Sequence, residues 1–482
     1  MPSIRKSLIS GVFYTAFAKY SNVFFSILIG AILARLLTPE DFGIVALVTV
    51  FVTFFNLLGD FGISKAVVQN QNLTKNDIQS IFVFSILFAL ALGALFFLAA
   101  PLISRFYDEP ELIKISRLLA LAVLFHALQG IPRALLEKNL EFKKIGIITV
   151  STQLSMGIFA IILAYKGFSY YALVIRAILT GFLLFSFFYL ISPIKIVFRI
   201  DPNAINKIIR FSVFNFMFNI INYFSRNGDN LLVGKFLGPS SLGFYNKAYR
   251  LMMLPVQNLT HVITPVMMPV LSKYQNDYNV IFNTYLKVVK VLATIGFPLS
   301  VFLFFSANEI VTIIYGPQWD QTIPVFKILA LIIGVQMIYS SAGSVFLAIN
   351  RTELLFYYGL ISACILLSGI SLGIFLGKSI LAVGCGIAIA FTISFFIVYY
   401  MLIHVALGKS FLQFIKTLLF PLFISLIMIV PLWIYSKYVS ENMFLGLALK
   451  VVISGLTFGA MYLSKREYRE ILQMGIKQYI RK

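Results

Sequence analysis

Acidic residues, histidine and cysteine are scarce in this sequence. Its 482 residues include 18 Asp and Glu, three His and two Cys. The two cysteines, Cys364 and Cys385, both lie inside apolar runs, so the sequence offers neither a disulfide framework nor a cysteine zinc site. A carboxylate count this low also argues against an enzyme with an ordinary charged surface. We therefore expect no metal, no cofactor and no enzymatic activity.

Motifs of ATP-driven transport and of metal-dependent hydrolysis are missing as well. The chain contains no GxxxxGK[ST] phosphate loop, no HExxH and no CxxC. Long polar segments are absent too, because no connection between apolar runs exceeds about 20 residues. The sequence therefore has no room for a soluble catalytic domain, and ATP is not expected to drive its function directly.

Apolar side chains are what the chain has in excess. Hydrophobic residues make up 60% of the sequence, charged residues 12%, and the mean hydropathy is +0.93. Soluble domains contain about 45–50% apolar and about 25% charged residues. The apolar runs are continuous and do not alternate with polar residues, which favours membrane helices over barrel strands. The chain is therefore expected to fold mostly in lipid.

A helix crosses the hydrocarbon core with about 20 apolar residues. Fourteen runs of this kind follow one another along the chain, each bounded by charge, Pro or Gly clusters. We therefore expect an all-α integral membrane protein with 14 transmembrane helices. The expected spans are residues 12–34, 43–64, 79–102, 117–137, 145–165, 169–192, 207–235, 245–271, 286–306, 323–349, 354–376, 379–407, 414–436 and 443–463.

The distribution of Lys and Arg predicts the orientation of these spans. Of the 39 basic residues, 24 would lie on the side of the two termini, 11 on the other side and four within spans. Cytoplasmic loops carry the excess of basic residues, so both termini are expected in the cytoplasm. The basic residues are spread through short connections and form no basic domain or arm. The net charge of +21 therefore reports membrane topology, and nucleic-acid binding is not expected.

One segment of the sequence occurs twice. Residues 34–43, ARLLTPEDFG, return at 234–243 as GKFLGPSSLG, which keeps a basic residue, Leu, Pro and Gly at an offset of 200. Six expected spans separate equivalent points, so the two copies share an orientation and indicate parallel repeats. The alternative is a generic helix–loop–helix end. We predict two parallel six-helix lobes and two extra helices with a basic tail. The predicted domains are residues 1–192, 193–407 and 408–482.

Polar side chains follow one face of several expected spans. In the first and seventh spans they recur every three or four residues, which keeps them on one helical face. Amides and charges at membrane depth are costly unless they contact partners or water. Interhelical hydrogen bonding is one interpretation, and a hydrated path for a substrate is the one that the repeat favours. The candidate substrate-binding residues are Lys19, Asn22, Arg176, Asn215, Asn219, Asn222 and Arg226.

The charged members of this set predict the kind of ligand. Lys19, Arg176 and Arg226 would place cations in the path, which suits an anionic head group such as a phosphate or a uronic acid. Asp60 and Asp229 are candidates for coupling to a proton or sodium gradient. Asp229 follows Arg226 by three residues, so an internal ion pair is the alternative role for both.

Two further ionisable residues are expected to be structural. His126 lies within an expected span, where an imidazole could carry a proton, but the sequence assigns it no partner. Lys450 lies in the last expected span, where a long side chain can extend its ammonium group to the membrane interface.

Several motifs together resemble a known family. They are residues 36–43 (LLTPEDFG), 59–63 (GDFGI), 227–230 (NGDN), 238–245 (GPSSLGFY) and 314–319 (IYGPQW). Their order and spacing over nearly the whole chain resemble the Wzx-like polysaccharide and O-antigen flippases. These belong to the multidrug/oligosaccharidyl-lipid/polysaccharide (MOP) exporter superfamily, and the group that exports colanic or teichuronic-type units is the most similar.

This resemblance implies a MATE-like bundle that alternates between the two faces of the bacterial cytoplasmic membrane. The implied substrate is an undecaprenyl-pyrophosphate-linked oligosaccharide, which is moved between leaflets for surface polysaccharide biosynthesis. Implied partners are membrane lipid, H⁺ or Na⁺ as coupling ion, and a complex with a polysaccharide polymerase or glycosyltransferase. Asp60 and Asp229 match motif positions of the family, whereas Lys19, Arg176 and Arg226 depend on the polar-face argument alone.

Three alternatives to this flippase function remain open at the level of sequence. A lipid II flippase shares the plan of fourteen spans. A multidrug cation antiporter of the same superfamily would normally have twelve spans and a path dominated by acidic residues. A membrane polysaccharide polymerase would need a large external loop, which the span map lacks. A flippase for lipid-linked oligosaccharides is therefore the predicted function.

Overall fold

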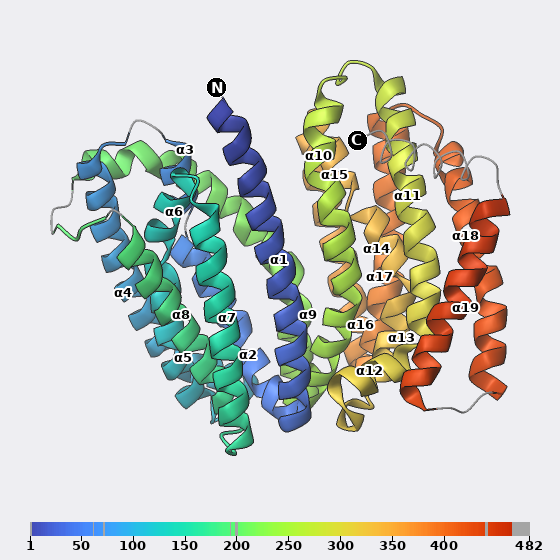
Figure 1. Ribbon diagram of the computed structural model, residues 1–482, viewed down its shortest axis with the longest axis horizontal. Coiled ribbons are helices and arrows are strands. Elements are labelled where there is room, and N and C mark those ends of the chain that lie inside the picture. Colours follow the sequence, from blue (N-terminus) through green and yellow to red (C-terminus); the bar gives the residue numbers. More distant parts are fainter. Residues whose placement is uncertain are drawn as a thin grey trace. The chain divides into compact units, whose positions relative to one another are not determined.

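The computed structural model describes residues 2–60, 62–70, 73–192, 194–197, 201–438 and 442–464. Within the helices, the side chains outside the described part are those of residues 2–15, 203, 206–222, 224–226, 261–263, 265–266 and 461–464. Every regular element of the described chain is a helix (Figure 1), as the apolar runs predict. The chain divides into two compact units, Met1–Gly243 and Phe244–Lys482.

The first unit is a bundle of α1 to α8 and most of α9. Their bounds are α1 (Pro2–Leu36), α2 (Pro39–Asp60), α3 (Ile63–Gln69), α4 (Lys75–Tyr107), α5 (Leu112–Leu128), α6 (Gly130–Lys138), α7 (Phe142–Tyr165), α8 (Tyr171–Ile191) and α9 (Pro202–Pro255). Helix α1 packs against α7, and α5 contacts α2, α4 and α8. The short helices α3 and α6 pack on each other, and their shared core encloses Val67 and Phe82 completely.

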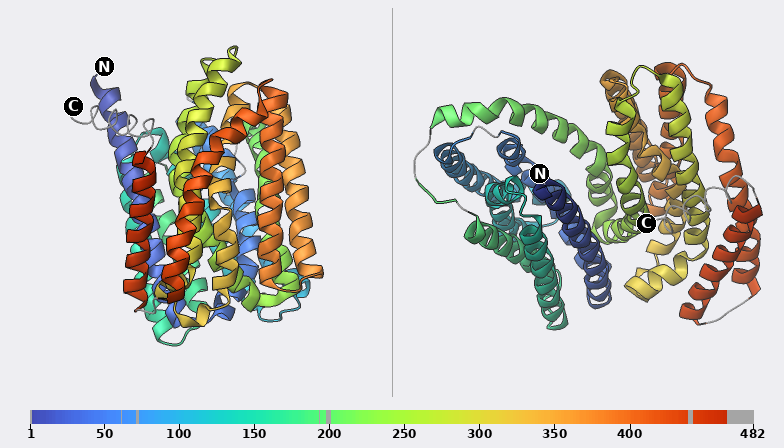
Figure 2. Two further views of the ribbon diagram at one scale, coloured as in Figure 1. Left: turned by 90° about the vertical axis from the view of Figure 1, so that its right-hand side faces the viewer. Right: turned by 45° about the horizontal axis from the view of Figure 1, so that its top comes forward.

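The second unit continues from the end of α9. Its elements are η1 (Val256–Thr260), α10 (His261–Ser272), α11 (Tyr278–Phe305), α12 (Ala307–Tyr315), η2 (Pro317–Trp319), α13 (Thr322–Leu331), α14 (Ile333–Tyr339), α15 (Ala342–Ala348), α16 (Thr352–Phe375), α17 (Ile380–Tyr400), η3 (Met401–Ala406), α18 (Phe411–Tyr438) and α19 (Met443–Ser464). Helix α11 contacts α13, α14 and α18. Figure 2 shows the helices of this unit, coloured from yellow-green to red along the chain. In the core, the Tyr285 hydroxyl lies 2.9 Å from Ser341 Oγ and 2.7 Å from the Tyr399 hydroxyl.

Most of the expected membrane spans are present as helices. Eleven stretches of the described chain are long and apolar enough to cross a membrane, and the bent pair Thr322–Leu331 and Ile333–Ala348 would make a twelfth. Each overlaps one expected run. The other two runs, 207–235 and 245–271, fall on α9, η1 and α10, and α9 consists of two helices that meet at a kink at Gly238, where the backbone is not helical (φ 81°). The expected count of 14 helices is therefore not confirmed.

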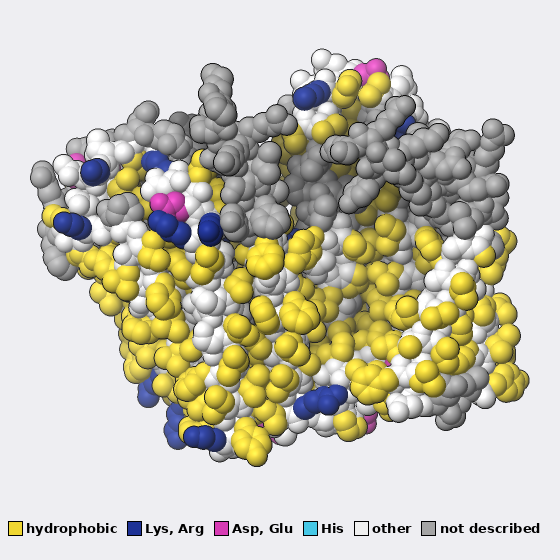
Figure 3. Space-filling model, in the orientation of Figure 1, with side chains coloured by type: hydrophobic (Ala, Val, Ile, Leu, Met, Phe, Trp, Pro, Cys, Tyr) yellow, Lys and Arg dark blue, Asp and Glu magenta, His cyan; other side chains and the backbone are white. Residues whose placement is uncertain are grey.

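The surface of the bundle is apolar where a soluble protein would be polar. On the face shown in Figure 3, hydrophobic side chains cover a broad band of the first unit, and Lys and Arg side chains lie along the edges of that band. Within such helices, Leu190 is 75% exposed and Leu98 is 72% exposed. Exposing apolar area to water costs about 25 cal/mol per Å², so lipid is the solvent that this surface fits.

The two copies of the repeated segment meet inside the first unit. A Cβ atom added to Gly43 would lie 1.8 Å from the carbonyl oxygen of Pro239, and one added to Gly243 would lie 2.1 Å from that of Pro39. Each glycine therefore lets its helix approach the proline of the other copy. This reciprocal packing gives a physical reason for the Pro and Gly that recur at an offset of 200.

Helices α16 and α17 approach closely through small residues. A Cβ atom added to Gly369 would lie 2.6 Å from the carbonyl oxygen of Gly386, and one added to Gly373 would lie 2.7 Å from the backbone of Val383. Glycines four residues apart are a common interface between membrane helices. Residues 369–373 read GISLG and so match the letters of a nucleophile elbow, but they lie inside a continuous helix and lack its strand–turn–helix setting.

Lys450 differs from its expected role. Its side chain is only 5% exposed, and Nζ donates to Glu309 Oε1 at 2.5 Å and to the carbonyl oxygen of Phe305 at 2.7 Å. The ammonium group therefore pairs inside the bundle and does not extend to the membrane interface. The ion pair joins α19 to α12, two helices that are separated by most of the second unit in sequence.

Candidate functional site

A polar cluster lies in the first unit near the ends of α2 and α5, within two candidate membrane spans that each continue into a short helix. Helix α2 ends at Asp60 before α3, and α5 ends at Leu128 before α6. Gly59 permits a close approach of α2 to α5, because a Cβ atom there would lie 3.0 Å from the Cβ atom of Ala127. Asp60 follows Gly59 and His126 precedes Ala127, and the carboxylate of Asp60 interacts electrostatically with His126.

Gln129 completes this cluster on the histidine side. Its Nε2 atom lies 2.9 Å from Nδ1 of His126. An amide nitrogen can only donate, so Nδ1 accepts and a neutral His126 ring carries its proton on Nε2. Oε1 of Gln129 is buried and has no hydrogen-bond partner among the described residues. A flip of the amide would place this oxygen as the acceptor for a protonated Nδ1, so Gln129 can serve both charge states of His126.

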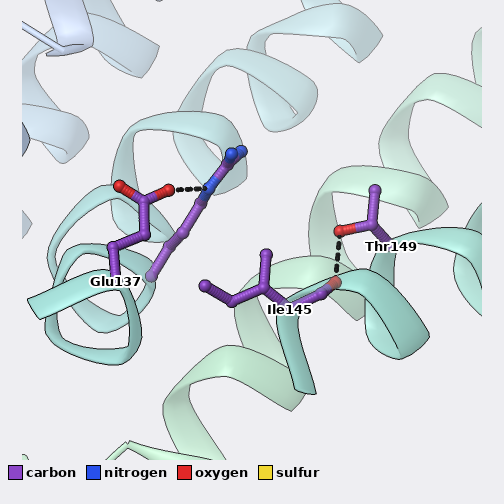
Figure 4. Close-up of polar contacts among 4 residues, drawn as sticks. Glu137, Ile145 and Thr149 are labelled. Carbon is purple, nitrogen blue, oxygen red and sulfur yellow. Dashed lines mark hydrogen bonds and ion pairs between the residues drawn. The ribbon is translucent and has the colours of Figure 1, made fainter. Parts of the chain in front are cut away.

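Arg133 and Glu137 form the outer part of the same region. Nε of Arg133 donates to Oε1 of Glu137 at 2.9 Å, and the pair is partly exposed on α6 (Figure 4). In the neighbouring α7, the Thr149 hydroxyl donates to the carbonyl oxygen of Ile145 at 2.7 Å (Figure 4). The positive charge of Arg133 and the negative charge of Asp60 act on His126 in opposite directions. Glu137 is paired with Arg133 and offsets part of the positive charge of Arg133.

The structure describes three of the predicted substrate-binding side chains. Lys19 is exposed on α1, and Arg176 is half-buried on α8 with contacts of its own. Asn22 is half-buried on α1, and its Oδ1 atom has no hydrogen-bond partner in the described chain. The other four predicted residues belong to α9, where their side chains lie outside the described part. These are Asn215, Asn219, Asn222 and Arg226.

Asp229 is one of the two predicted coupling residues and is buried in α9. Its Oδ1 accepts the backbone N–H of Asn230 at 2.8 Å, and it has further interactions. The predicted pair with Arg226 involves a side chain outside the described residues. Oδ1 of the neighbouring Asn230 is buried without a hydrogen-bond partner in the described part of the chain. Asp229 therefore stays a predicted coupling residue, with less structural support than Asp60.

Sequence reasoning missed two polar residues. Gln129 was overlooked, although its spacing of three residues from His126 on one helix face indicates contact. Asp41 was read only as part of a motif, yet its buried carboxylate ties two connections together. Its Oδ2 accepts both the N–H and the hydroxyl of Thr38 at 2.8 Å. Its Oδ1 accepts the hydroxyl of Ser169 and, at 3.1 Å, the N–H of Tyr170.

Residues 32–324 match the family described as polysaccharide biosynthesis protein. The chain belongs to this family. One of its relatives is WzxC, the lipopolysaccharide biosynthesis protein of Escherichia coli (strain K12). The two are 27% identical over 438 residues, which cover 88% of this chain and 86% of WzxC.

The fold is similar to that of solved membrane transporters. The lipid II flippase MurJ in its inward closed conformation gives a TM-score of 0.74 at 20% identity, covering 96% of this chain and 100% of MurJ. An inward-facing MATE family transporter of the MOP superfamily gives a TM-score of 0.60 at 14% identity, covering 81% of this chain and 96% of that one. At these identities the likeness establishes the fold.

These findings confirm the family that the motifs resemble and the MATE-like architecture. The chain is a multi-pass membrane transport protein of polysaccharide biosynthesis in the bacterial inner membrane. Because its relatives and its fold are those of transporters, the expectation that it is not an enzyme is confirmed as well.

Proposed function

We propose that this protein is a flippase for undecaprenyl-pyrophosphate-linked oligosaccharide units. It moves them from the inner to the outer leaflet of the cytoplasmic membrane by alternating access, with both chain termini in the cytoplasm. The observation that carries the proposal is the likeness to the lipopolysaccharide biosynthesis protein WzxC along 88% of the chain, on a fold shared with a lipid II flippase. A sugar–pyrophosphate head cannot cross hydrocarbon unaided, whereas a polyprenyl tail can stay in lipid.

The head group binds to polar side chains that the membrane spans carry. Lys19, Arg176 and Arg226 contact the anionic pyrophosphate or a uronic acid. Asn22 hydrogen-bonds to the sugar hydroxyls, together with Asn215, Asn219 and Asn222. The exposed ammonium group of Lys19 and the partner-free Oδ1 of Asn22 support this assignment, because both stand on α1 three residues apart. The two six-helix lobes, 1–192 and 193–407, carry one polar face each.

A proton gradient drives the cycle through Asp60 and His126. Three features of this cluster support a proton site: an acid that interacts electrostatically with an imidazole, an amide that can pair with either charge state of that imidazole, and the place of these groups within candidate membrane spans. Asp229 is the second candidate for such a site.

Deletion of the gene in its host, followed by mass spectrometry of extracted polyprenyl-linked saccharides, tests the function. The flippase proposal predicts that one complete repeat unit accumulates on its lipid carrier in the inner leaflet. Re-expression of the wild-type protein restores export, and the triple variant Lys19→Ala/Arg176→Ala/Arg226→Ala does not. Accumulation of lipid II would instead identify a peptidoglycan flippase. Unchanged glycolipids with altered sensitivity to cationic drugs would contradict the proposal and favour an antiporter.

A further inference from the structure

A pocket of about 340 Å³ opens between α11 and α18 in the second unit. Three of its seven lining side chains are lysines, and none is acidic. The lining residues are Leu286, Lys287, Lys290, Gln413, Lys416, Thr417 and Phe420. The lining includes none of the predicted substrate-binding residues, and none of Asp60, His126 and Gln129.

The lysines are held on opposite walls. Lys287 and Lys290 are three residues apart and share a face of α11, while Lys416 lies on the facing side of α18. The two walls are joined near their beginnings, where Nζ of Lys409 donates to Oδ1 of Asn279. The pocket is therefore built by two packed helices and does not depend on a loop.

The charge of this pocket favours an anion. Three lysine side chains line one small volume, and none of the seven described lining residues carries a carboxylate. A phosphate oxygen cluster between the two walls would contact lysines from both helices, and lysine is a common point-charge ligand for phosphate. Gln413 and Thr417 add neutral groups able to hydrogen-bond to a phosphodiester or to a glycerol hydroxyl.

The position along the helices favours a lipid over a soluble anion. Helix α11 has 28 residues and is about 42 Å long, which exceeds the hydrocarbon core of about 30 Å. Lys287 and Lys290 lie in the first half of α11, and the uninterrupted apolar segment of the helix begins after them. This order places the two lysines near the lipid headgroup layer. After the lysines along each helix, apolar side chains are exposed: Val291 on α11 is 46% exposed, and Leu419 and Phe423 on α18 are 56% and 55% exposed. An acyl chain can lie along this apolar surface.

We propose that this pocket binds the phosphate headgroup of an anionic phospholipid, whose acyl chains cover α11 and α18. The lysines lie on the side predicted to be cytoplasmic, and the leaflet on that side attracts basic pockets through its anionic lipids. Helix α18 lies outside the predicted six-plus-six repeat, and the pocket gives it a defined role as one wall of a lipid site. This inference does not depend on the proposed flippase function.

The experiment uses the full-length protein in nanodiscs of phosphatidylcholine, with phosphatidylglycerol added in steps. Native mass spectrometry counts bound lipid, and thermal unfolding reports the stabilisation. We expect preferential binding of phosphatidylglycerol, reduced about a hundredfold in Lys287→Gln/Lys290→Gln/Lys416→Gln. The control variant is Lys114→Gln/Lys166→Gln/Lys378→Gln, which removes three exposed lysines elsewhere and should keep wild-type binding.

Three outcomes overturn the proposal. They are an undiminished preference for phosphatidylglycerol in the pocket variant, an equal loss in the control variant, and an equal stabilisation of the wild type by inorganic phosphate alone. Unfolding in pure phosphatidylcholine checks that the pocket variant is folded. If the triple variant does not fold, Lys287→Gln and Lys416→Gln are measured singly, and each is expected to weaken binding about fivefold.

Discussion

Gly43 packs directly on the carbonyl group of Pro239, and the same contact recurs in reverse between Gly243 and Pro39. The two copies of the repeated segment are therefore also in contact, since the glycine of each copy packs on the proline carbonyl group of the other. The helix ends that carry the two copies stay close only while both glycines lack a side chain.

Gly43→Ala is expected to destabilise the protein by about 1–3 kcal/mol or more, because its Cβ atom has no room beside Pro239. Thermal unfolding in detergent measures this loss. Gly30→Ala, on α1, is the matched control, since a Cβ atom at Gly30 would have no atom within 4 Å. It should unfold at the wild-type temperature or slightly above, because alanine favours helix over glycine. Equal stability of the two variants would contradict the packing argument.

Asp41→Asn is expected to lower stability by about 1–3 kcal/mol, because an amide cannot accept all four hydrogen bonds that this carboxylate receives from Thr38, Ser169 and Tyr170. Limited proteolysis should then cut the connection between α7 and α8 faster. Glu40→Gln changes the neighbouring carboxylate and should leave cleavage unchanged. A cleavage rate in Asp41→Asn equal to that in Glu40→Gln would show that the carboxylate does not hold the connection.

Lys450→Met is expected to cost about 3–5 kcal/mol, because it leaves the carboxylate of Glu309 without its cation in a mostly buried position. The double variant Lys450→Met/Glu309→Gln should recover much of that loss, since no isolated charge remains. Thermal unfolding measures the stability of both variants. The control is Lys437→Met, which changes an exposed lysine at the end of α18. A double variant as unstable as Lys450→Met would argue against a pairwise interaction.

The apolar runs predicted where helices lie, because burial in lipid depends on local composition. The run 354–376 became α16, Thr352–Phe375, and the run 145–165 became α7, Phe142–Tyr165. Local composition does not reveal a bend of 50° within an apolar stretch, such as the one after Leu331. It also does not reveal how the two helices of α9 are joined at Gly238, whose positive φ of 81° forms a kink.

The candidate site was harder to predict than the helices, because its partners are distant in sequence. The motif identifies Asp60, but the imidazole with which Asp60 interacts electrostatically belongs to another span. Lys450 was assigned to the interface because its partner, Glu309, stands 141 residues earlier. A single sequence shows which ionisable groups enter the membrane, whereas their pairing follows from the tertiary packing of helices such as α2 on α5.

Transport driven by a pH gradient depends, in our proposal, on the imidazole of His126 and the carboxylate of Asp60. His126→Gln and Asp60→Asn should each reduce gradient-driven flipping in proteoliposomes by at least about tenfold. Exchange in the absence of a gradient should persist, because neither residue belongs to the predicted head-group contacts. Gln129→Leu removes the amide that pairs with both charge states of His126 and should shift the pH dependence of transport.

The matched control for the histidine is His404→Gln, which changes an exposed imidazole that lies against the ring of Tyr400 in the second unit. It should transport as the wild type does at every imposed gradient. If an imposed pH gradient stimulates transport equally in His126→Gln, Asp60→Asn and the wild type, these two residues do not take part in coupling. Asp229→Asn would then be the next variant to measure, because its carboxylate is also buried in the first unit.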